Sequence, residues 1–123
     1  MKFVREPGSA VTIRQVEKGL IRVGSETVTE NVILFRDSIR RGWKTDDVTN
    51  LKEEDLAELI AEEPEILLFG SGWQSLLPPR DLVFALARKG IGFETMDTPA
   101  ACRTFNILVS EGRDVAAVLV IDQ

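Results

Sequence analysis

A short apolar run that ends in glycine places the strongest constraint on the fold. Residues 65–69, with the sequence Glu-Ile-Leu-Leu-Phe, stand between Pro64 and the turn Gly70-Ser71-Gly72-Trp73. An apolar run this short, bounded by proline and glycine, predicts a strand that is buried on both faces. The two glycines of the turn allow the backbone to change direction sharply or to approach another group closely.

The C-terminal half of the chain alternates between strand and helix patterns. After the strand at 65–69, an apolar stripe predicts a helix over 78–90, opened by two prolines and ended by a glycine. A short strand over 91–94, a helix from 98 to about 110 and a buried strand over 115–121 follow. This β-α-β-α-β order predicts helices packed on a sheet, with parallel pairing of at least the first two strands.

Two positions have the pattern of a helix N-cap. Thr98 is followed by Pro99, and a hydroxyl residue before a proline is typical of a helix start. Asn50 stands three residues before Glu53, which resembles a capping box. The second pattern predicts a helix that begins near Asn50 and ends before Pro64.

The N-terminal half predicts smaller, antiparallel pieces after a loose arm over residues 1–10. Alternating and apolar runs predict four strands, at 11–18, 20–23, 26–29 and 32–35, the second and third joined by the hairpin turn Gly24-Ser25. The basic stretch from Arg36 to Lys44 predicts one more strand or an irregular edge. By its length, the whole chain, 1–123, is expected to form one α/β domain.

The composition excludes several kinds of site and partner. A net charge of −5 and a sequence pI of 4.8 disfavour nonspecific binding to nucleic acid or to anionic membranes. The chain has no histidine and one cysteine, which excludes a Ser-His-Asp triad, an intrachain disulfide and a cysteine-built zinc site. We therefore expect no catalytic residue, metal or cofactor.

The expected location is the cytoplasm. The first residues carry neither the apolar core of a signal peptide nor the arginine- and serine-rich character of a transit peptide. No apolar run approaches the length of about 18 residues that a membrane-spanning helix needs, so we expect no membrane insertion.

The turn after the 65–69 strand is the first candidate binding site. Gly70-Ser71-Gly72-Trp73 would lie beyond the carboxyl end of a strand, where open α/β sheets bind ligands. The third glycine of a dinucleotide-binding motif is missing, and no P-loop ending follows. The pattern leaves open whether the turn binds a small ligand or anion, or serves backbone geometry and partner contact. Asp97-Thr98 would join this site if both lie at the same end of the sheet.

The helix that starts at Thr98 carries the second candidate surface. Arg103, Asn106 and Ser110 fall at i, i+3 and i+7 and therefore share one face, which is either ordinary solvent surface or a recognition surface. Cys102 is expected in the core, and its alternative role as a reactive thiol lacks a histidine or second cysteine to support it.

A family resemblance covers residues 64–120 and is carried by the stretches 64–72, 90–108 and 111–113. These stretches resemble a small family of uncharacterised domains that includes the mitochondrial complex I assembly factor 3 and an adipogenesis-associated human homologue. The resemblance implies a compact three-layer α/β fold with a mixed sheet. For the mitochondrial relative it implies a non-catalytic role in which partner proteins are bound during assembly of a respiratory complex. It offers no catalytic residues to transfer.

Two functional hypotheses follow. The leading one is a non-enzymatic, assembly-factor-like domain that binds a protein partner. The alternative is a small-metabolite or anion-binding protein, or a weak enzyme, that uses the turn after 65–69 and the helix start at 97–98. A homo-oligomer is left open, and we expect no nucleic-acid partner.

Overall fold

The structure is a computed structural model, and it describes residues 11–44 and 48–121. The arm expected over residues 1–10 lies outside the described residues.

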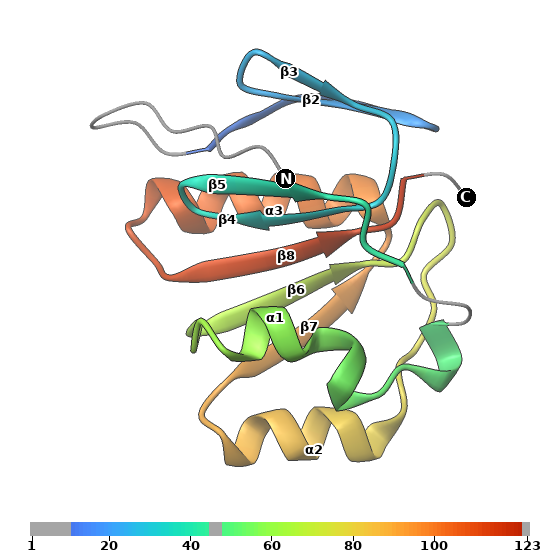
Figure 1. Cartoon of the computed structure of the whole chain (residues 1–123), viewed down its shortest axis with the longest axis vertical. Helices are drawn as coiled ribbons and strands as arrows, with labels where there is room; N and C mark the ends of the chain where they lie inside the picture. Colours follow the sequence, from blue (N-terminus) through green and yellow to red (C-terminus); the bar gives the residue numbers. More distant parts are fainter. Residues whose placement is uncertain (1–10, 45–47, 122–123) are drawn as a thin grey trace.

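The centre of the fold is a mixed five-stranded sheet (Figure 1). Its strands run in the order β5 (Ser38–Arg41), β4 (Val32–Phe35), β8 (Val115–Leu119), β6 (Ile66–Gly70) and β7 (Gly92–Met96). The strand that the sequence singled out, β6, lies between β8 and β7 and is parallel to both. The hairpin of β4 and β5 adds antiparallel strands on the far side of β8. The expected mixed sheet and parallel pairing are confirmed.

A second, antiparallel sheet is formed by β1 (Ile13–Glu17), β2 (Leu20–Val23) and β3 (Glu26–Val28). Alternation along these strands buries one face, because Ile21 and Val28 are fully buried while Arg22 and Thr27 between them are exposed. The turn between β2 and β3 contains Gly24 at a φ of 59°, a conformation that favours glycine.

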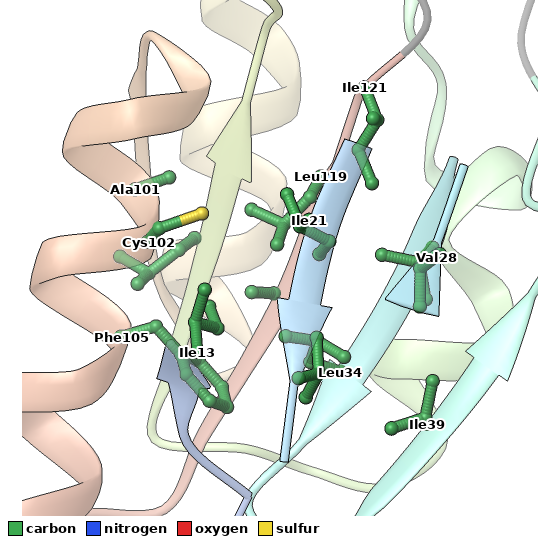
Figure 2. Close-up of a cluster of buried hydrophobic side chains, with 14 of the residues drawn as sticks. Ile13, Ile21, Val28, Leu34, Ile39, Ala101, Cys102, Phe105, Leu119 and Ile121 are labelled. Carbon is green, nitrogen blue, oxygen red and sulfur yellow. The ribbon is translucent and has the colours of Figure 1, made fainter. Parts of the chain in front are cut away.

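The helices and the small sheet make the outer layers. On one face of the large sheet, α3 (Thr98–Ser110) and the small sheet share a core, in which Cys102 and Phe105 of α3 lie close to Ile13 of β1 (Figure 2). On the other face lie two short helices, α1 (Ala57–Ile60) and α2 (Arg80–Arg88), whose apolar residues pack on Leu67 and Phe69 of β6. The expected three-layer α/β fold is confirmed.

The acidic helix expected after Asn50 is different in the structure. Val48–Asn50 is a single 3₁₀ turn (η1), and a second 3₁₀ turn (η2, Glu53–Leu56) leads directly into α1. The capping box predicted at Asn50 and Glu53 is wrong by two residues, since the carboxylate of Asp55 accepts from the N–H of Lys52 at 2.9 Å. Leu51, just before this start, is buried, so tertiary packing as well as capping decides where the helical segment begins.

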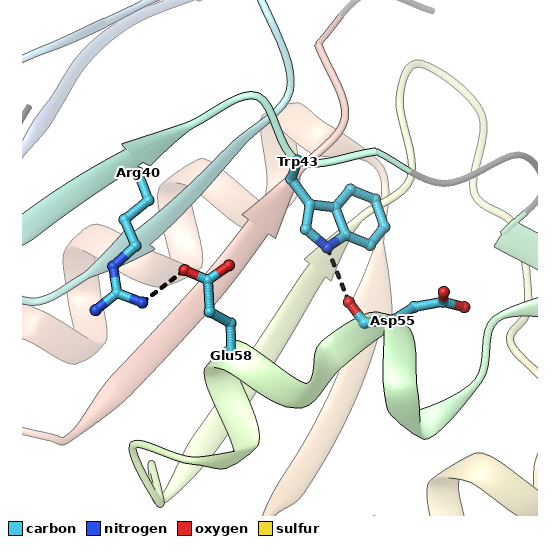
Figure 3. Close-up of polar contacts among 4 residues, drawn as sticks. All are labelled: Arg40, Trp43, Asp55 and Glu58. Carbon is cyan, nitrogen blue, oxygen red and sulfur yellow. Dashed lines mark hydrogen bonds and ion pairs between the residues drawn. The ribbon is translucent and has the colours of Figure 1, made fainter. Parts of the chain in front are cut away.

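Two contacts attach this helical segment to the β5 hairpin (Figure 3). The indole Nε1 of Trp43 donates to the carbonyl oxygen of Asp55 at 3.0 Å, and the Trp43 ring packs edge-on against Phe69. Arg40 donates to the carboxylate of Glu58 at 2.7 Å. The basic stretch 36–44 therefore serves internal contacts at these two positions, and β5 is the strand predicted there.

Candidate functional site

The turn after β6 and the start of α3 lie together at one end of the large sheet. The N–H of Ser71 donates to the carbonyl of Met96, the last residue of β7, at 2.9 Å. The N–H of Thr98 donates to the carbonyl of Gly72 at 2.7 Å. From the sequence, these two segments were expected to be neighbours if both lay at the same end of the sheet. In the structure they lie at the same end and contact each other.

Thr98 is the central residue of this junction. Its side chain is fully buried, and its hydroxyl donates to the carbonyl of Val120 at 2.7 Å and accepts from the N–H of Gly72 at 2.9 Å. One hydroxyl thus joins α3 to the segment after β8 and to the turn after β6. A buried group with both of its functions satisfied in this way stabilises the junction.

The predicted N-cap at Thr98 is wrong by one residue. Asp97 is the N-cap, because its backbone is extended and its carboxylate accepts from the N–H of Ala100 at 2.8 Å. Pro99 then occupies the second helical position, and the hydroxyl of Thr98 is left for the tertiary bonds. Aspartate and threonine both cap helices well, so the sequence pattern alone did not distinguish them.

Gly70 is required by the close approach of α3. A Cβ atom on Gly70 would lie 3.0 Å from both the Cα and the Oγ1 of Thr98, and 3.1 Å from a methyl group of Leu119. Gly70 therefore serves packing between β6 and α3, which is one of the two roles that the sequence left open.

Ser71 closes the turn internally. Its side chain is buried, and its Oγ lies 2.6 Å from the carbonyl oxygen of Gln74 and accepts from the N–H of Leu76 at 3.2 Å. Gly72 follows with a φ of 95°, which explains the second glycine. Trp73 is half-buried.

The polar stripe expected on α3 is interrupted by Asn106. Its amide nitrogen donates to the carbonyl of Ile13 at 2.8 Å, and its amide oxygen accepts from the N–H of the same residue at 2.9 Å. Asn106 therefore attaches β1 to α3, and its expected place on a solvent face is wrong. Arg103 is exposed, and its role in binding stays a prediction.

Cys102 lies in the core, as expected. It is 2% exposed, and burial raises the pKa of its thiol to about 12, although the nearby positive charge of Arg103 opposes this shift. The thiolate is the nucleophilic form, so a thiol with this pKa stays protonated and unreactive at neutral pH.

Among the residues that the structure describes, three large apolar side chains are exposed, and the sequence patterns did not predict this. Leu77 in the loop between β6 and α2 is 80% exposed, Ile107 on α3 is 56% exposed and Phe84 on α2 is 53% exposed. Leu77 is the most exposed and stands four residues after Trp73, in the same loop. A signal was present in the pair Leu76-Leu77 directly before two prolines, where a helix has not yet begun to bury its apolar side.

Two kinds of feature are absent from the part of the chain that the structure describes. No three His, Cys, Asp or Glu residues there are grouped so that they could hold a metal ion. None of the helices there has the length and apolar character needed to cross a membrane.

Comparisons with known proteins extend these observations. A family model described as "Protein of unknown function (DUF498/DUF598)" matches residues 13–120. A Francisella tularensis protein named 13 kDa major membrane protein is 36% identical over 77 residues, which cover 63% of this chain and 63% of that protein. The crystal structure of a Bordetella parapertussis protein has a TM-score of 0.84 and 29% identity, covering 95% of this chain and 100% of that chain.

A vertebrate relative has a name that describes a role. NADH dehydrogenase (ubiquinone) 1 alpha subcomplex assembly factor 3 of Danio rerio is 35% identical over 80 residues, which cover 63% of this chain and 46% of that protein. The chain thus spans less than two thirds of the length of either of these curated relatives.

Proposed function

This chain belongs to the DUF498/DUF598 family of proteins of unknown function, and we propose that it acts by binding protein partners, in a role like that of an assembly factor. The resemblance inferred from residues 64–120 is confirmed by this match and by the assembly-factor relatives. The assembly role is proposed because of the name of those relatives, and the site is proposed because of the geometry at the sheet end where the turn after β6 meets α3.

One observation carries the proposal. At the sheet end where α/β proteins bind small ligands, three polar side chains are already bonded to the protein's own backbone. The hydroxyls of Thr98 and Ser71 and the carboxylate of Asp97 each hold a neighbouring segment in place. Next to them, the same loop presents Leu77, which is 80% exposed, and Trp73, of a residue type enriched at protein interfaces. These features support a contact surface.

The geometry weighs against the alternative of an anion or metabolite site at this position. An anion at the start of α3 would bind the free N–H groups of the first turn. Asp97 places its own carboxylate there and accepts from Ala100, so an incoming anion would meet a negative charge. The N–H of Gly72 is likewise used by Thr98.

The interaction surface we propose is centred on Trp73 and Leu77. A substitution of an exposed side chain such as Leu77→Ser normally changes stability by no more than about 0.5 kcal/mol. If Leu77 contacts a partner, the same change removes apolar contact area from the interface. Phe84→Ser is the matched control, since Phe84 is also exposed and apolar but stands on α2.

The test is a quantitative pull-down from cells of the source organism with wild-type, Leu77→Ser and Phe84→Ser protein. We expect wild-type and Phe84→Ser protein to retain the same proteins. Leu77→Ser should recover about tenfold less of them. Equal recovery by all three proteins would contradict the proposed surface. The absence of any protein retained above a mock control would contradict the proposed function.

We also propose a cytoplasmic location. Fractionation of the same cells tests it, with the chain expected in the soluble fraction. Recovery in the membrane fraction after a high-salt wash would contradict this location and would favour a setting like the one in the name of the Francisella relative.

A further inference from the structure

Strand β7 is one of the two edge strands of the large sheet, and some of its backbone groups point away from the protein's other strands. The N–H of Gly92 donates to Glu65 at 3.0 Å, and the carbonyl of Met96 accepts from Ser71 at 2.9 Å. In a parallel ladder the N–H and C=O of one residue face the same neighbour, and the next residue faces the other way. Phe93 and Thr95 therefore direct their N–H and C=O groups to the open edge.

The other sheet edges carry features that discourage pairing with a further strand. At β5, Arg41 donates to the carbonyl of Thr27 in β3 and pairs with Glu26, so these two edges hold each other. At β1, the register is irregular between Ile13 and Gln15. The β7 edge differs, because it has five residues in regular register and contains no proline, lysine or arginine.

A small apolar surface lies beside this edge on the α3 side. Ile66, Met96 and Leu108 are half-buried there and pack against the core shared with α3. Gly92 pairs with Ile66 and leaves it without a covering side chain from β7. Space does not require this glycine, because the nearest atom to an added Cβ would be the Glu65 carbonyl oxygen at 3.7 Å.

The charge of the edge favours one kind of occupant. Glu94 is exposed and is the one ionisable residue of β7. In an antiparallel pairing, the residue opposite Glu94 would belong to a non-hydrogen-bonded pair, where side chains are closest. A second copy paired about Glu94 would place two carboxylates opposite each other, which is destabilising, whereas lysine or arginine there would be favourable.

We propose that the β7 edge binds an extended segment of a partner protein as a sixth strand of the large sheet. The backbone of the segment bonds to Phe93 and Thr95, a basic side chain lies opposite Glu94, and an apolar side chain covers Ile66. This mode of recognition is β-strand addition, in which main-chain bonds give affinity and alternate side chains give specificity. The inference rests on the proposed function, because it assigns a binding mode for a protein partner.

The test uses capped synthetic peptides of about seven residues, the length of an ordinary strand, with alternating valine and threonine. One series has lysine at the centre and the other has glutamate. Amide hydrogen exchange and NMR titration follow each peptide up to millimolar concentration. We expect the lysine peptide to slow exchange at Phe93 and Thr95 and to bind about fivefold or more tightly than the glutamate peptide. No slowing at these two amides with either peptide would overturn the proposal.

Two variants make the result specific. Thr95→Pro removes an edge N–H that the peptide would bond, so we expect about tenfold weaker peptide binding. Folding should stay normal, because proline is tolerated on an edge strand where that N–H faces solvent. Glu94→Lys should reverse the preference between the two peptides. Unchanged preference in Glu94→Lys would overturn the assigned contact. Protection of Phe93 and Thr95 in free protein that grows with concentration would show a second copy on this edge and would also overturn the proposal.

The same variants separate this inference from the proposed function. If Thr95→Pro retains the partners that Leu77→Ser loses in the pull-down, the edge is not the docking site and the function stands. If wild-type protein retains no partner above the mock control, the function itself fails.

Discussion

Thr98→Val is the substitution that tests the junction at the sheet end most severely. Valine keeps the branched shape of threonine but has no hydroxyl. The change leaves the carbonyl of Val120 without this donor and the N–H of Gly72 without this acceptor, in a site where the side chain is fully buried. Buried polar groups that lose their partners are costly, so we expect a large loss of stability from one atom.

The magnitude follows from the number of groups affected. Each orphaned buried group costs about 1–3 kcal/mol, and removing the hydroxyl's own burial cost offsets part of this, so we expect a net loss of about 2–4 kcal/mol. For a chain of this length that loss corresponds to a fall of roughly 10 °C in melting temperature. Thr98→Ser is the control, because it keeps the hydroxyl and should cost only about 1 kcal/mol for one methyl group.

Urea unfolding monitored by circular dichroism measures both variants. We expect valine to be clearly less stable than serine, with the same dependence of unfolding free energy on urea concentration. A Thr98→Val protein within about 0.5 kcal/mol of wild type would refute the structural role of the hydroxyl. So would a serine variant that is as unstable as the valine variant.

Three other predictions concern the packing and ionisation of neighbouring residues. Gly70→Ala should lower the free energy of unfolding by about 1–3 kcal/mol in urea melts, because the added Cβ would meet α3. Gly92→Ala has space around its added Cβ and should be neutral or slightly stabilising, so equal losses in the two variants would contradict this. Asn106→Ala should cost about 1–3 kcal/mol through its two bonds to Ile13 and should speed amide exchange there; unchanged exchange would contradict the tether. Burial raises the pKa of the Cys102 thiol from 9.0 to about 12. The unfolded chain therefore loses this proton first, and the free energy of unfolding falls as the pH rises from 9.0 toward 12. Cys102→Ala should show a shallower fall, and an identical slope would contradict the assignment.

Strand positions were the part of the fold most open to prediction from sequence. The bounds of β2 and β4 were predicted to the residue, and β6 was displaced by one residue. Their side-chain patterns are set by burial on one or both faces of a sheet, which the sequence records directly. The helix start near Asn50 failed because its position depends on where Leu51 packs, and not on capping residues alone.

The structure brings the two segments of the candidate site together, but the sequence did not predict the bonds that their residues make. Thr98 bonds to a carbonyl 22 residues later in the chain, and Asn106 bonds to Ile13, 93 residues away. Bonds between such distant residues leave no periodic trace in a single sequence. A hydroxyl or an amide on a helix therefore looked available for binding, although the tertiary structure already uses it.

Native mass spectrometry of the protein, purified gently from cells of the source organism, tests the central claim most directly. The claim is that the chain binds proteins and that its sheet-end polar groups hold the fold. We predict species with the mass of this chain plus a partner protein, which Leu77→Ser loses and Phe84→Ser keeps. A stoichiometric small-molecule adduct on the chain, retained by Leu77→Ser and without any protein partner in wild type, would contradict the account.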